Sequence, residues 1–198
     1  DCISEEMQEQ LYQLNPYNVV RLIFGKILET DNDSDNRYTR AASTFKEWQE
    51  EKVLTQDCEP AIYLYDQKFL TEDGEEVVRK GFLALAKLED FSTGLIKPHE
   101  QTLEGPKTDR FQLMKACKAN FCSIFSLYSD PCCVLESLLK KSRERAPDLL
   151  IRDNTLNEEH SLWRVTDSSK IKKAQELLSG KPIFIVDGHH RYETALMY

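Results

Sequence analysis

Short turns join neighbouring strand-like runs in this chain, and this limits the folds that it can adopt. Residues 61–69 and 77–88 are two such runs, and Asp73-Gly74 between them is a strong β-hairpin signal. Residues 149–152 and 161–166 predict a second hairpin. Because hairpins pair strands antiparallel and helical segments lie between them, we expect an α+β fold with a mixed sheet and flanking helices, and not a doubly wound parallel sheet.

Capping residues and amphipathic spacing predict the helices. Ser4 is a suitable N-cap for a helix over residues 4–14, and apolar residues in segment 35–48 recur at helical intervals. Further helices are expected over residues 109–121, from Asp130-Pro131 onwards, between Thr166 and Gly180, and after Gly188.

Three further segments predict strands. Residues 18–24 are apolar and β-branched, residues 123–128 are strand-like, and residues 182–186 form a short continuous apolar run. We expect the first to be a buried strand and the last to be buried on both faces. We also expect two α+β portions, residues 1–90 and 91–198, the second of which begins with a long stretch without periodicity.

Charge and composition exclude several classes of protein. The 198 residues include 26 Lys and Arg against 34 Asp and Glu, a formal net charge of −8, which argues against a broad nucleic-acid-binding surface. No apolar run approaches the roughly 20 residues of a membrane-spanning helix. The 6 cysteines have irregular spacing, so we expect thiols without a role in a cytoplasmic protein.

The junction between the last strand and the last helix carries the sharpest chemical signal. Residues 187–191 read Asp-Gly-His-His-Arg, and we call them the turn motif. A helix N-terminus attracts anions, Gly188 permits a tight turn and Arg191 suits bidentate phosphate contacts. Asp187 can ligate Mg²⁺ or accept a proton from a hydroxyl group, and Glu193 is a second carboxylate. The predicted phosphate-binding residues of this motif are Gly188, His189, His190 and Arg191.

A second polar group lies between residues 97 and 110, where a loop leads into a helix. It again places cations near a helix N-terminus, so we expect it to form the facing wall of the same site. The alternative is structural in both places, with Asp187 and Thr108 as helix caps and the other side chains in solvent. The candidates here are His99, Thr102, Lys107 and Arg110 as phosphate-binding residues and Glu100 and Asp109 as catalytic carboxylates.

Several stretches carry a resemblance to a known family: residues 15–21, 98–102, 105–110, 119–120, 127–130, 162–164 and 186–195. Together they resemble the family catalogued as domain of unknown function 1015 (DUF1015). Members of that family are about twice as long as this chain, so the resemblance implies part of a longer polypeptide. The short helix after Gly188 agrees with this, because about two turns are not stable without docking.

The turn motif is also similar to the phosphate-binding turn of the ParB/sulfiredoxin superfamily, which includes free-serine kinases. Sulfiredoxin chemistry is not expected, because His189 stands where sulfiredoxins carry a nucleophilic cysteine. The similarity implies a kinase that uses Mg²⁺ and transfers a phosphoryl group from ATP or ADP to a small hydroxyl metabolite such as free L-serine. Asp187, Glu193, Glu100 and Asp109 are all left open as its base. The alternatives are a nucleotide-binding regulatory module without catalysis and a ParB-like partner of nucleic acid.

Overall fold

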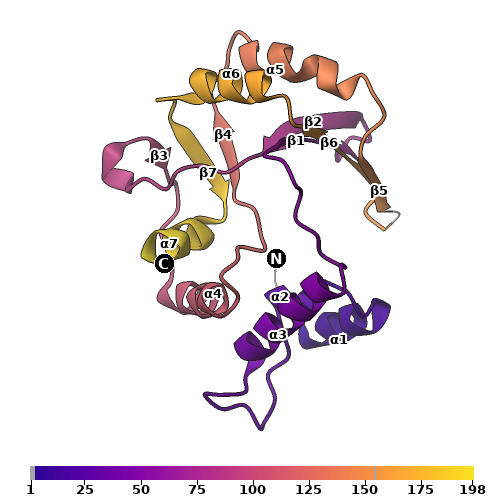
Figure 1. Ribbon diagram of the computed structural model, residues 1–198, viewed down its shortest axis with the longest axis vertical. Coiled ribbons are helices and arrows are strands. Elements are labelled where there is room, and N and C mark those ends of the chain that lie inside the picture. Colours follow the sequence, from indigo (N-terminus) through magenta and orange to yellow (C-terminus); the bar gives the residue numbers. More distant parts are fainter. Residues whose placement is uncertain (1–2, 154) are drawn as a thin grey trace. The chain divides into compact units, whose positions relative to one another are not determined.

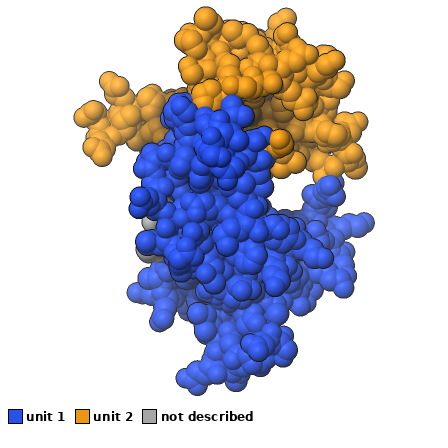
Figure 2. Space-filling model, turned by 90° about the vertical axis from the view of Figure 1, so that its left-hand side faces the viewer, with its two compact units in different colours: residues 1–56, 88–127, 184–198 blue, residues 57–87, 128–183 orange. Residues whose placement is uncertain are grey.

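The computed structural model describes residues 3–153 and 155–198, which form helices and two β-sheets (Figure 1). The α+β class is confirmed. The chain divides into two compact units, coloured separately in Figure 2. Unit 1 comprises the chain up to Gln56, Leu88–Leu127 and Phe184–Tyr198, and unit 2 comprises Asp57–Lys87 and Tyr128–Ile183. Each unit takes residues from both of the expected portions, 1–90 and 91–198. The expected division of the chain into these two domains stays a prediction.

Unit 2 is built on an antiparallel sheet with the strand order β2-β1-β6-β5. Both predicted hairpins are confirmed, since β1 pairs with β2 and β5 pairs with β6. The first hairpin has Gly74 at its turn with a φ of 81°, and its second strand ends at Leu83 rather than at residue 88. The strands are β1 (Ile62–Leu70), β2 (Glu76–Leu83), β5 (Leu149–Asp153) and β6 (Glu158–Val165).

One face of this sheet forms the core of unit 2 with two helices, α5 (Val134–Leu139) and α6 (Ser168–Leu178). A 3-10 turn, η2 (Lys140–Arg143), follows α5. Asp167 begins α6 as predicted, because its carboxylate accepts the N–H groups of Ser169 and Lys170. The core consists of Ile62, Leu64, Leu135, Leu139, Trp163, Val165 and Ala174.

The substitution Ile62→Val is expected to lower the free energy of unfolding by about 1 kcal/mol, because it removes a methylene group from a packed core. Ile62 is 6% exposed, whereas Ile151 on the same sheet is 50% exposed. The matched substitution Ile151→Val should therefore change little. Urea denaturation of both variants measures the difference, and equal losses would contradict the assigned core.

Unit 1 contains the other helices and most of a three-stranded sheet with the order β3-β7-β4. Ser4 begins α1 as predicted, because its hydroxyl accepts the Met7 N–H at 3.2 Å. Asn36 begins α3 in a reciprocal capping box with Thr39. The elements are α1 (Glu5–Leu14), α2 (Val20–Ile23), α3 (Arg37–Glu50), η1 (Phe91–Thr93), β3 (Ile96–Lys97), α4 (Glu104–Cys117), β4 (Phe125–Tyr128), β7 (Ile183–Asp187) and α7 (His189–Met197).

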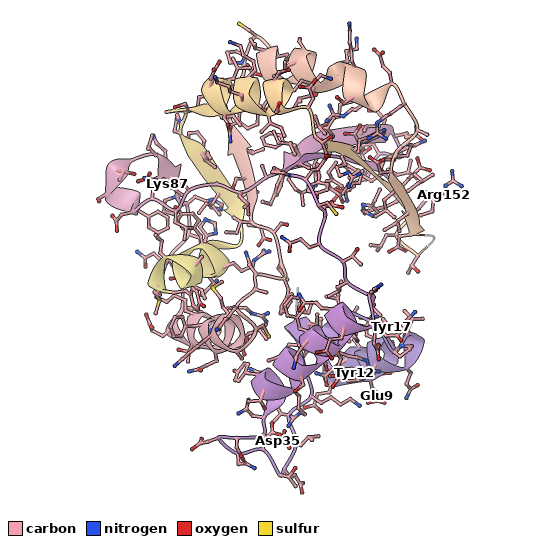
Figure 3. All side chains as sticks on the ribbon, in the orientation of Figure 1. Glu9, Tyr12, Tyr17, Asp35, Lys87 and Arg152 are labelled. Atoms are coloured by element: carbon pink, nitrogen blue, oxygen red, sulfur yellow. The ribbon has the colours of Figure 1, made fainter. Side chains whose placement is uncertain are left out.

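Helix α1 is attached to the rest of unit 1 through Tyr12, which Figure 3 labels. The Arg21 guanidinium lies 4.3 Å from the centre of the Tyr12 ring, and the Lys26 ammonium lies 4.7 Å from it. Lys26 also forms an ion pair with Glu9, one turn before Tyr12. These cation–π contacts join α1 to the chain around α2. Farther along, Ala41 of α3 packs with Leu113 and Cys117 of α4 in a small apolar cluster.

Two of the expected buried strands were predicted wrongly. Within residues 18–24 the structure forms the short helix α2, because the side-chain oxygen of Asn18 accepts the Val20 N–H at 3.0 Å and starts a helical turn. An apolar run of this length does not distinguish a strand from a helix. The run at 182–186 does form β7, but only Ile185 is buried, while Phe184 and Val186 are exposed.

Two helices begin at other residues than predicted. Helix α4 begins at Glu104, so Thr108 lies inside it and is not its cap. Pro106 is tolerated there because the first turn has no intrahelical partner for its missing N–H. Helix α5 begins at Val134 rather than at Pro131, because Cys133 has a φ of 50° and interrupts the helical path.

None of the helices in the described ranges, 3–153 and 155–198, is long and apolar enough to cross a membrane.

Candidate functional site

The predicted strand–turn–helix junction is present in unit 1. Strand β7 ends at Asp187, Gly188 turns the chain with a φ of 96°, and α7 begins at His189. A Cβ atom on Gly188 would lie 2.9 Å from Cζ of Arg191, because the guanidinium lies against the glycine. The backbone conformation therefore favours glycine here, and a larger residue would also displace the end of the flexible Arg191 side chain.

His189 is buried, with 2% of its surface exposed, and both of its ring nitrogens face the loop before α4. Its Nε2 accepts the backbone N–H of His99 at 3.3 Å, and its Nδ1 lies 3.5 Å from Oε2 of Glu100. Nδ1 of His99 lies 2.8 Å from the carbonyl oxygen of Ile185, which places a proton on that nitrogen. In this arrangement His189 and His99 hold the loop against β7 and α7.

The other residues of the two predicted groups also contact one another. Nε2 of His190 accepts the Leu103 N–H at 2.9 Å. The Thr102 hydroxyl donates to Glu193 at 2.6 Å, and the Lys107 ammonium lies 3.2 Å from the same carboxylate. The structure thus brings the two groups together, with α4 and α7 side by side (Figure 1). Their phosphate-binding and catalytic roles stay predictions.

Glu193 is expected to stabilise the protein near neutral pH and to lose this effect in acid. Burial alone would raise the pKa of Glu193, but the bonds from Thr102 and Lys107 outweigh it and hold the pKa below the ordinary 4.5. Because the folded pKa is the lower one, the stabilisation is present above pH 4.5 and is lost as the pH falls through the folded value.

Melting temperatures measured between about pH 7 and about pH 3 test this linkage. The variant Glu193→Gln should melt lower at neutral pH and should lose less on acidification than the wild type. Glu50→Gln, at an exposed position on α3, is the control and should keep the wild-type profile. A Glu193→Gln variant with the wild-type acid sensitivity would contradict the assigned role.

The two arginines of the predicted site are held in place by the same kinds of contact. Arg191 donates to the carboxylate of Asp187 and to the carbonyl oxygen of Ser123. Arg110 donates to the carbonyl oxygen of Ile23 at 3.0 Å, and its Nε lies 3.2 Å from Oδ2 of Asp109. Each guanidinium is therefore fixed by one carboxylate and one backbone carbonyl. These contacts leave further N–H donors on both groups for a ligand.

Both arginines line one hollow in unit 1, which we call the arginine hollow. It is open to solvent, and its inner volume is about 20 Å³, room for about one water molecule. Thr194 also lines it, is fully buried, and has a hydroxyl oxygen without a hydrogen-bond partner in the described structure. A buried hydroxyl is normally paired, so this oxygen is an unsatisfied acceptor and donor at the inner wall of the hollow. The lining residues are Ile23, Arg110, Leu113, Met114, Ala119, Asn120, Phe121, Cys122, Arg191 and Thr194.

Asp109 lies in a smaller hollow of about 10 Å³ that shares Ile23 and Leu113 with the arginine hollow. Its Oδ1 accepts from Arg37 and, at 2.9 Å, from the Tyr38 hydroxyl. With Arg110 on its other oxygen, the carboxylate is engaged on both sides. The structure therefore shows Asp109 as the group that orients Arg110.

Sequence reasoning missed three residues that line the arginine hollow. Asn120 lies in the loop after α4, which Lys118 ends with a φ of 51°. Cys122 was assigned no role, and Thr194 was not considered. The spacing of Thr194 could have indicated it, since residues three apart on a helix share a face with one another, as Arg191 and Thr194 do.

The described residues contain no group of three or more His, Cys, Asp and Glu side chains placed to hold a metal ion. The predicted Mg²⁺ ligand Asp187 is 59% exposed on its side chain and pairs with Arg191. A single exposed carboxylate is too few ligands to hold a cation by itself. It is better suited to contact a Mg²⁺ ion that is already bound to a nucleotide.

The site is thus an arginine-lined hollow at the strand–turn–helix junction of an α+β protein. A family model described as "Protein of unknown function (DUF1015)" matches residues 1–198. The chain belongs to this family. No curated protein and no solved structure matches the chain. The similarity of the turn motif to the ParB/sulfiredoxin superfamily therefore gains no support from these comparisons.

Proposed function

We propose that this protein binds a nucleotide through its phosphate groups in the arginine hollow. The observation that carries the proposal is that two oriented guanidinium groups, Arg110 and Arg191, and the unpartnered hydroxyl of Thr194 line the same hollow. Arginine is suited to phosphate because its planar fork donates two parallel hydrogen bonds.

The charge around the hollow supports an anionic ligand. The chain as a whole has a formal net charge of −8 and each guanidinium is paired with one carboxylate, so an anion would be held by the N–H donors that these pairs leave free. Both groups are fixed before a ligand arrives, which lowers the entropy lost on binding. The inner volume of about 20 Å³ has room for about one water-sized group, so the hollow can take a phosphate oxygen, with the rest of the nucleotide outside it.

Phosphoryl transfer to a small hydroxyl metabolite, free L-serine among them, is the reaction proposed for this site. The similarity of the turn motif to free-serine kinases suggests it, and the position of Asp187 favours it. Its exposed carboxylate pairs with Arg191, so it lies next to the proposed phosphate position, where it can hold Mg²⁺ or accept the hydroxyl proton. Such a transfer depends mainly on positioning and charge neutralisation.

Isothermal titration of the full chain with ATP, ADP and inorganic phosphate tests the binding proposal. We expect ATP or ADP to bind with micromolar affinity and phosphate to compete with it. No binding at about millimolar nucleotide would overturn the proposal.

A separate assay tests the reaction. The protein is incubated with ATP or ADP, Mg²⁺ and a panel of hydroxyl metabolites that includes L-serine, and phosphorylated products are detected by mass spectrometry. A product that depends on one acceptor supports a kinase. Nucleotide binding without any product would instead favour a regulatory module, and salt-sensitive retention of DNA would favour a nucleic-acid partner.

A further inference from the structure

We infer that Cys122 is a modification site at which the thiol reacts preferentially with anionic electrophiles, and that its modification blocks the arginine hollow. The inference rests on the proposed function, because both place an anion beside Arg110 and Arg191. Cys122 is half-buried and lines the hollow with them. The next residue, Ser123, accepts a hydrogen bond from Arg191 through its carbonyl oxygen, so the thiol belongs to the segment that the guanidinium contacts.

A second observation indicates that the hollow receives a ligand. Thr194 is fully buried, lines the same hollow, and has a hydroxyl oxygen without a hydrogen-bond partner in the described structure. The donors of the two arginines can hold the acidic group of a reagent next to Cys122. The N–H donors that Arg110 and Arg191 keep beside their own carboxylates can bind an anion, which accelerates its reaction there relative to a neutral analogue.

The other described cysteines differ in ways that make them internal controls. Cys117 is buried, and burial raises the pKa of its thiol to about 11, so it should react slowly with every reagent. Cys58, Cys132 and Cys133 are exposed and do not line the hollow. They report how fast an accessible thiol reacts without the two guanidinium groups.

Iodoacetate is the anionic probe and iodoacetamide its neutral analogue. In both reactions the sulfur of Cys122 forms a bond to the methylene carbon, the carbon–iodine bond breaks, iodide leaves, and the thiol proton passes to solvent. Iodoacetate leaves a carboxymethyl group on the sulfur. Because this new carboxylate pairs with Arg110 or Arg191 from inside the hollow, it competes with any phosphate there.

The experiment is limited alkylation of the full chain with each reagent, followed by peptide mass spectrometry. The ratio of iodoacetate to iodoacetamide labelling should be about tenfold higher at Cys122 than at the exposed cysteines. Inorganic phosphate should lower this ratio. The variant Arg191→Ala should bring it close to that of the exposed cysteines, whereas Arg152→Ala, which removes an exposed, ion-paired arginine of β5, should leave it unchanged.

An equal labelling ratio at Cys122 and at the exposed cysteines would overturn the inference. Because the competition by inorganic phosphate is measured on the wild-type protein, this test does not depend on whether the variant folds. Protein carboxymethylated at Cys122 that binds ATP as well as untreated protein would overturn the blocking effect. The experiments distinguish failure of the nucleotide proposal from failure of the Cys122 proposal. A high ratio without nucleotide binding refutes only the nucleotide proposal, and nucleotide binding with an equal ratio refutes only the role of Cys122.

Discussion

Replacing Arg191 with alanine is expected to weaken ATP binding about thirtyfold, which corresponds to a charge-assisted hydrogen-bonding group worth about 2 kcal/mol. The side chain is 22% exposed and donates only to Asp187 and to the Ser123 carbonyl among the described residues, so the fold should survive its removal. Isothermal titration gives the affinity, and circular dichroism gives the melting temperature.

Two further variants make this test specific. Arg191→Lys keeps the charge but removes the planar fork, so its affinity should fall between those of the wild type and the alanine variant. Arg152→Ala removes an exposed arginine that pairs with Glu159 in unit 2, and it should bind ATP normally. Unchanged ATP affinity in a folded Arg191→Ala protein would contradict the proposed phosphate site.

Replacing Gly188 with alanine is expected to destabilise the protein by about 2 kcal/mol and to weaken ATP binding as well. The glycine has a φ of 96°, which strains any other residue, and the new Cβ would lie 2.9 Å from both Cζ and Nε of Arg191. Backbone strain lowers stability, and displacement of the guanidinium lowers affinity.

Two other glycines separate these effects. Gly74 has a φ of 81°, and a Cβ atom added to it would have no neighbour within 4 Å, so Gly74→Ala should lose stability through strain alone and keep its ATP affinity. Gly105 has no close neighbour and lies in the first turn of α4, so Gly105→Ala should be neutral or stabilising. Denaturant titration compares the three, and a Gly188→Ala variant that behaves like Gly105→Ala would refute the close approach of Arg191.

Local chemistry made much of the fold predictable. The hairpin at Asp73-Gly74 and the caps at Ser4 and Asp167 are decided by residues within a few positions of one another, and the structure confirms them. The strand expected at 18–24 failed because apolar composition does not report the backbone bond that Asn18 accepts from Val20.

The candidate site was predictable only in part. The turn motif and the loop before α4 were selected by residue type, and the structure brings them together. The sequence could not show that His189 and His190 accept backbone N–H groups of that loop, because these bonds join residues about 90 positions apart. Nor could it show the hollow, because Asn120, Cys122 and Thr194 meet the two arginines only through the packing of α4 and α7.

The central claim is that nucleotide phosphates bind between Arg110 and Arg191. The most direct test is a crystal structure of the protein grown with ATP or ADP. The account predicts electron density for phosphate groups within hydrogen-bonding distance of both guanidinium groups. Density for the phosphates at another place on the protein, with the arginine hollow occupied by water alone, would contradict it.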